Sequence, residues 1–126
     1  SEHDILDTVA DTSKILAAAG FEVTCLGVDH DPRPLLDELR ARPPLAVFNL
    51  FEGLATRPGT EVSAAALLEW LDVPFTGCPS SAMVLGRDKI RAKHLLAAAG
   101  LPTPAYAVVE AGPVPEWRGG WPAIVK

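Results

Sequence analysis

The sequence predicts an α/β fold with a Rossmann-like parallel sheet. Segments with a helical pattern alternate along the chain with short apolar segments that have the composition of strands. One of these, residues 45–50, is almost continuously apolar, as expected for a parallel strand that is covered on both faces. The composition also favours a folded domain, because 48% of the 126 residues are hydrophobic and the mean hydropathy is +0.20.

The first predicted helix begins with a cap formed by Ser1 and Asp4. Its apolar residues recur on one face, and Gly20 is a common C-terminal stop. Residues 21–28 follow as a predicted strand.

A second helix is predicted to begin at Asp31 and Pro32, with the aspartate as cap and the proline at the first helical position. Leucines supply its apolar side, and Pro43 and Pro44 end it. The apolar residues 45–50 then form the next predicted strand.

The third predicted helix starts near Thr60 and Glu61, and a short strand at 73–76 follows it. The segment 77–79 then turns into a short helix. Glycine and proline in this segment favour the turn.

Asp88 is predicted to cap a further helix that runs to Ala99 and is stopped by Gly100. Residues 101–109 are expected to be extended, and residues 122–126 to form a final strand. Because the chain begins on a helix and ends on a strand, we expect one strand to precede it and a larger domain to follow it.

Composition and charge argue against several classes of protein. A net charge of -5 argues against a nucleic-acid partner, which favours a basic face. No apolar run approaches the ~20 residues that cross a bilayer, and this sequence shows no basic-then-apolar pattern of a secretory leader. Cys25 and Cys78 are two isolated cysteines, which is typical of a reduced, cytoplasmic protein.

A candidate binding site follows the predicted strand 45–50. Asn49 lies at its carboxyl end, and Glu52 and Gly53 come just beyond it. Ligands of open α/β sheets bind at such strand ends. Glu52 could accept a hydrogen bond from a substrate ammonium, and Gly53 would let a ligand approach the backbone. The alternative is that Asn49 and Glu52 only close a turn with their own side chains.

Three lysines are candidates for binding an anion. Lys89 and Lys93 are four residues apart and share one helix face, so a triphosphate between them would offset their repulsion. Lys126 follows an apolar strand and could place its charge on a phosphate. In the alternative interpretation all three ammonium groups are simply solvated.

Other motifs carry little weight. No glycine-rich phosphate loop is present, and the consecutive Asp29, His30 and Asp31 are a poor metal set, because neighbours in sequence rarely converge on one ion. No metal-binding residue is therefore predicted in this chain.

Five motifs, in this order, resemble the D-alanine–D-alanine ligase branch of the ATP-grasp ligases. They are Asn49–Gly53, Pro74–Gly77, Asp88-Lys89, Pro102–Pro104 and Ile124–Lys126. The resemblance implies a pre-ATP-grasp domain at 1–86 and the truncated start of the ATP-grasp central domain at 87–126.

By this resemblance, Lys89 and Lys126 bind ATP, and the Mg²⁺ ligands lie beyond Lys126. The implied activity is ATP-dependent ligation of a carboxylate to an amine through an acyl phosphate, with this segment inactive by itself. The motif at 49–53 is similar to a sub-branch that uses other amino acids or short peptides. The family also implies small-molecule substrates and a homodimer.

Two alternatives to a ligase stay open. One is a non-catalytic nucleotide-binding or regulatory module that keeps the fold. The other is a structural α/β domain whose basic helix face pairs with a neighbouring subunit.

Overall fold

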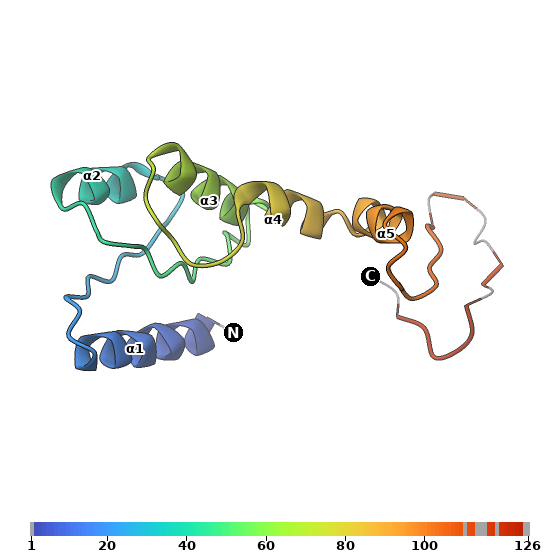
Figure 1. Cartoon of the computed structure of the whole chain (residues 1–126), viewed down its shortest axis with the longest axis horizontal. Coiled ribbons are helices and arrows are strands. Elements are labelled where there is room, and N and C mark those ends of the chain that lie inside the picture. Colours follow the sequence, from blue (N-terminus) through green and yellow to red (C-terminus); the bar gives the residue numbers. More distant parts are fainter. Residues whose placement is uncertain (1, 110, 113–115, 118, 125–126) are drawn as a thin grey trace. The chain divides into compact units, whose positions relative to one another are not determined.

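The computed structural model describes residues 2–109, 111–112, 116–117 and 119–124. Helices dominate these residues (Figure 1). Two compact units make up the chain, the first ending at Ser81 and the second beginning at Ala82. The helices of the described residues are α1 (Glu2–Ala18), α2 (Arg33–Ala41), α3 (Thr60–Trp70), α4 (Ser80–Arg87) and α5 (Lys89–Ala98).

The helices occur where the sequence predicts them, because their stop signals are local. After α1, Gly20 adopts a φ of +90°, and the N–H of Phe21 donates to the carbonyl of Leu16. After α5, Gly100 has a φ of +70°, and the N–H of Leu101 donates to the carbonyl of Leu96. Both are helix ends closed by a left-handed glycine. The predicted start of the first helix at Ser1 lies outside the described residues.

The predicted parallel sheet is not formed by the described residues, which is a correction to the expected fold. What remains of it is a single parallel bridge between Val47 and Phe75, from two of the predicted strands. The N–H of Val47 donates to the carbonyl of Pro74 at 2.8 Å, and the N–H of Thr76 donates to the carbonyl of Val47 at 3.0 Å.

Two residues explain why this ladder does not extend. Pro74 has no N–H, so it cannot donate the next bond on one side of the bridge. On the other side, the N–H of Asn49 donates to the side-chain oxygen of Thr76 instead of a backbone carbonyl. A strand needs a partner strand, and residues 22–28 make no backbone hydrogen bond to another segment that the structure describes.

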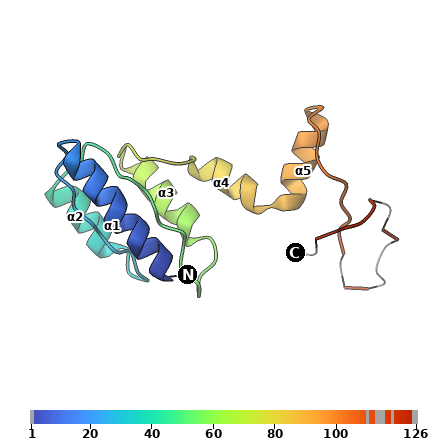
Figure 2. The same ribbon diagram turned by 90° about the horizontal axis from the view of Figure 1, so that it is seen from below.

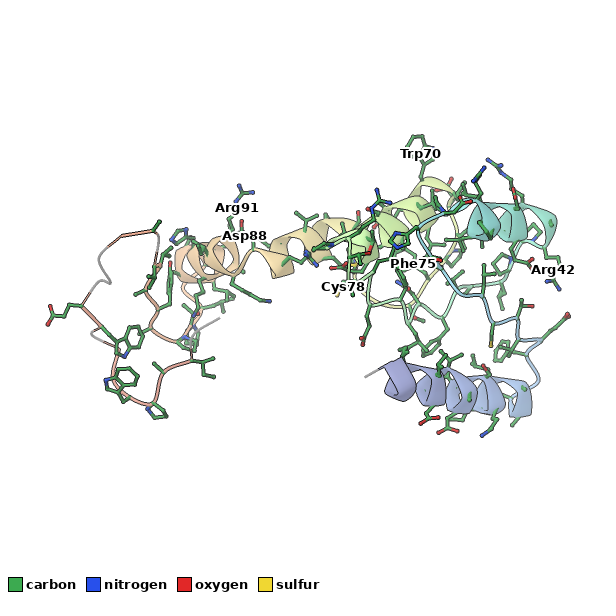
Figure 3. All side chains as sticks on the ribbon, turned by 180° about the vertical axis from the view of Figure 1, so that it is seen from behind. Arg42, Trp70, Phe75, Cys78, Asp88 and Arg91 are labelled. Carbon is green, nitrogen blue, oxygen red and sulfur yellow. The ribbon has the colours of Figure 1, made fainter. Side chains whose placement is uncertain are left out.

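The core of the first unit lies on one face of α3. Ala65 and Leu68 are the buried hydrophobic residues among those described, at 0% and 2% exposure. Trp70, at the end of the same helix, is 86% exposed and projects away from it (Figure 3). Leu45, on a predicted strand, is 81% exposed, which follows from the absence of a formed sheet among the described residues. None of the described helices combines the length and apolarity that crossing a membrane requires.

In the second unit the chain turns back after α5. Figure 2 shows the segment after this helix descending beside it. The left-handed Gly100 produces the reversal, and it brings residues 103–106 against the side chains of α5. This reversal positions one of the two candidate sites.

Candidate functional site

Asn49 lies two residues after Val47, which forms the bridge to Phe75. Its backbone N–H donates to Oγ1 of Thr76 at 3.0 Å, and its Oδ1 accepts from the N–H of Phe51 at 3.2 Å. The side chain therefore closes an Asx turn, as in the alternative interpretation of the motif. This turn directs the chain into the loop that carries Glu52.

The loop from Phe51 to Gly59 is held against the start of α3. Oγ1 of Thr60 accepts from the N–H of Leu54 at 2.8 Å and donates to the carbonyl of Arg57 at 3.0 Å. One hydroxyl thus joins two points of the loop to the first residue of the helix.

Gly53 has a structural reason to be glycine. Its φ is +93°, and a Cβ there would lie 2.5 Å from Oε2 of Glu61 and 3.3 Å from Oγ1 of Thr60. The space beside this backbone is therefore taken by the Glu61 carboxylate, which belongs to the first turn of α3. Glu52 is exposed, so its carboxylate is the group of this motif that can meet a ligand.

His30 is a further neighbour of this loop. From the sequence, His30 was considered only as a metal ligand. Its Nε2 lies 3.5 Å from Oγ1 of Thr56, and its backbone N–H donates to Oδ1 of Asp29 at 2.6 Å. No sequence pattern signalled the contact between His30 and Thr56, because 26 positions separate the two residues.

Asp31 is engaged in its own turn. Its Oδ1 accepts from Nε of Arg33 at 2.8 Å and from the backbone N–H of Arg33 at 3.0 Å. These bonds, the guanidinium first, lower the pKa of the Asp31 carboxyl. Among the residues that the structure describes, no group of three or more His, Cys, Asp or Glu side chains could hold a metal.

A carboxylate that sequence analysis did not single out closes the connection from α3 to α4. Glu69 accepts from the backbone N–H of Ser80 at 2.8 Å and from the Ser80 hydroxyl. These bonds, the hydroxyl first, lower the pKa of Glu69. The carboxylate therefore sits on the N-terminus of α4, where a negative charge is favourable.

The second candidate site is the lysine face of α5. Asp88 caps this helix by accepting from the N–H of Arg91 at 3.0 Å, and its Oδ2 pairs with Nε of Arg91 at 3.0 Å (Figure 3). Lys89 is exposed, and its ammonium donates to the carbonyl of Gly86.

Lys93 behaves differently from Lys89. It is half-buried, and its Nζ donates to Oγ1 of Thr103 at 3.0 Å and to the carbonyl of Pro104 at 2.8 Å. The same nitrogen lies 4.9 Å from the centre of the Tyr106 ring. The two ammonium groups of the predicted basic face are therefore held by neutral acceptors, and their positive charge remains uncompensated by these contacts. Lys126, the other predicted ATP ligand, lies outside the described residues.

The comparisons with known proteins identify a ligase relationship. The chain is 43% identical over 90 residues to a D-alanine–D-alanine ligase of Cereibacter sphaeroides, covering 71% of this chain and 27% of that protein. It is 40% identical over 94 residues to the same enzyme of Sinorhizobium medicae, covering 75% and 28%. For the enzyme of Gloeobacter violaceus the identity is 35% over 118 residues, covering 88% and 37%.

These matches place the chain among relatives of ligases. More narrowly, it is a relative of the D-alanine–D-alanine ligase family, and the resemblance seen in its motifs is confirmed over most of its length. The chain spans only about a third of the curated relatives it matches, from 27% to 37% in the three cases above. No family model matches the chain, and no solved structure gives a significant match.

Proposed function

We propose that this chain is the N-terminal segment of an ATP-dependent carboxylate–amine ligase. Identities of 35–43% to D-alanine–D-alanine ligases over most of the chain carry the proposal. In this proposal residues 1–86 are the pre-ATP-grasp domain and residues 87–126 begin the ATP-grasp domain. The segment is inactive until the rest of the ligase follows it.

Lys89 and Lys126 are the proposed ATP ligands. The ammonium of Lys89 has three donors, and the carbonyl of Gly86 takes one of them. The remaining donors can meet phosphate oxygens without breaking that contact. In the described contacts the Asp88 carboxylate pairs with Arg91, so it does not neutralise the ammonium of Lys89.

The proposed chemistry is a two-step ligation. A carboxylate oxygen attacks the γ-phosphorus of ATP, and ADP leaves. An amine then attacks the carbonyl carbon of the acyl phosphate, and inorganic phosphate leaves with the carboxylate oxygen. Lysine ammonium groups would stabilise the charge that develops on the transferring phosphoryl group.

Mg²⁺ would supply further positive charge at the phosphates. Its ligands are proposed to lie beyond Lys126, as the family resemblance implies. The chain's own part is limited to holding the nucleotide and the substrates.

Asn49, Glu52 and Gly53 are the proposed substrate-binding motif. The exposed Glu52 carboxylate would accept from the ammonium of an amino acid or short peptide. Asn49 and Gly53 would act by shaping the loop, the first through its Asx turn and the second through its close approach to Glu61. A cytoplasmic homodimer completes the proposal, on the strength of the family alone.

ATP binding and turnover by the full-length protein test this function. We expect ADP release that depends on an added amino acid. We also expect the affinity for ATP to fall by about tenfold or more when Lys89 is replaced by alanine. Lys14→Ala is the matched control, because Lys14 is an exposed helical lysine whose ammonium pairs with Asp11.

The two classes of function give different results. ATP binding without amino-acid-stimulated ADP release would support the non-catalytic nucleotide-binding module instead. Equal ATP binding by the wild type, Lys89→Ala and Lys14→Ala proteins would refute the assignment of Lys89.

A further inference from the structure

We propose that Lys93 is a positioning residue, which fastens the segment 103–106 to α5 and is not a second phosphate ligand. The inference rests on the proposed function only where it concerns ATP. The claim that Lys93 fastens the segment rests on three contacts of its ammonium group, with Thr103, Pro104 and Tyr106.

One edge of the returning segment lacks two donors for pairing with a strand. Pro102 and Pro104 flank Thr103, and neither has an N–H to give to a ladder. The acceptors and side chains of the segment can hold it instead. The carbonyl of Pro104 and the hydroxyl of Thr103 are such groups, and both accept from Lys93.

Burial supports a structural use of this lysine. Lys93 and Thr103 are both half-buried, whereas Lys89 is exposed. The hydrogen bond between Lys93 and Thr103 is partly buried, and charged donors form stronger bonds than neutral ones. The Tyr106 ring adds a cation–π contact to the same nitrogen.

A second side chain of α5 contacts the same tyrosine. The ring centres of His94 and Tyr106 are 6.0 Å apart, with an angle of 56° between their planes. Two consecutive residues of α5 thus face the segment 103–106, while Lys89, one turn earlier, donates to the carbonyl of Gly86. The two lysines have separate roles, although their spacing puts them on one helix face.

For the proposed ligase, the role of Lys93 is to position the chain that follows α5. The segment 103–106 is the beginning of the chain that leads from α5 toward Lys126. Lys93 therefore holds the start of this connection in place without touching ATP itself.

Hydrogen–deuterium exchange of the full-length protein tests this assignment. In Lys93→Met, which keeps an apolar stem but loses the ammonium, we expect the backbone amides of 99–101 to exchange about tenfold faster, because they donate within the helix end from which the fastened segment returns. Lys89→Met is the matched control and should leave these amides within about twofold of the wild type. The amides of α1 report whether the rest of the chain stays folded.

Two more variants separate a specific contact from a general loss of stability. Lys93→Arg keeps donors for both acceptors and should restore most of the protection. Thr103→Val should raise exchange by itself but add little in the Lys93→Met background, because both changes remove the same bond.

The outcomes are distinct. Unchanged exchange of 99–101 in Lys93→Met overturns the proposal, and weaker ATP binding in that variant would then make Lys93 a phosphate ligand. If the wild-type protein binds no ATP, the proposed function fails, yet the exchange comparison still decides the role of Lys93.

Discussion

The backbone N–H of Asn49 donates to the hydroxyl oxygen of Thr76 at 3.0 Å, although 27 positions separate the two residues in sequence. This bond joins the ends of two predicted strands and replaces the backbone bond that would lengthen their ladder. It also holds the start of the loop that carries Glu52. The proposed substrate motif therefore depends on a residue outside it.

Replacing Thr76 tests this dependence. We expect Thr76→Val to lower the free energy of unfolding by about 1 kcal/mol, because the N–H of Asn49 loses its acceptor. Thr76→Ser keeps the hydroxyl and should lie closer to the wild type. Urea unfolding of the three proteins measures the difference, and equal loss in both variants would show that the hydroxyl is not what matters.

Gly53→Ala should lower the stability of the protein more than Gly20→Ala, although both glycines have a left-handed backbone. Gly53 and Gly20 have φ values of +93° and +90°, but of these two only Gly53 has atoms of another residue within 4 Å of the place that a Cβ would take. Both substitutions should cost about 1–2 kcal/mol of backbone strain. Gly53→Ala should cost a further ~1 kcal/mol, because the end of the Glu61 side chain must move and Oγ1 of Thr60 is crowded. Equal thermal stability of the two variants would contradict the close approach.

The Glu69 carboxyl should make stability depend on pH in the acid range. Its pKa is lowered in the folded chain by the Ser80 hydroxyl and backbone N–H, relative to the ordinary value of 4.5. Because the pKa of Glu69 is lower in the folded protein, the stabilisation that it contributes is complete above pH 4.5. This stabilisation is lost as the pH falls through the pKa of Glu69 in the folded protein.

Glu69→Gln should therefore flatten the decline of unfolding free energy in acid. Ser80→Ala is the companion variant, since it should raise the pKa of Glu69 toward its ordinary value in an NMR titration. An unshifted Glu69 titration in the wild type would show that the bonds to Ser80 are not maintained in solution.

The helices were predictable because their signals are local. Gly20 and Gly100 end their helices in the conformation that glycine favours, and Asp88 caps α5 with its own side chain. Strands depend on partners elsewhere in the chain, so the apolar pattern of 45–50 could not reveal where pairing stops. Pro74 and Thr76 limit it to one bridge.

The candidate site was predictable in part for the same reason. Residues of one helix face are visible from their spacing, which grouped Lys89 with Lys93. The spacing carries no information about the segment that returns after Gly100, and this segment is what takes the ammonium of Lys93. The grouping of Asn49 with Glu52 rested on a predicted strand end, of which the described residues form one bridge. The contact of His30 with the loop required the fold.

The transfer of a carboxylate oxygen to phosphate tests the ligase proposal most directly. The full-length protein would be given ATP and an amino acid labelled with ¹⁸O in its carboxylate, and the phosphate released would be analysed by mass spectrometry. Attack of the carboxylate on ATP predicts one ¹⁸O atom in each phosphate, together with an amide product. Unlabelled phosphate, or no ADP in the presence of any amino acid or dipeptide, would contradict the account.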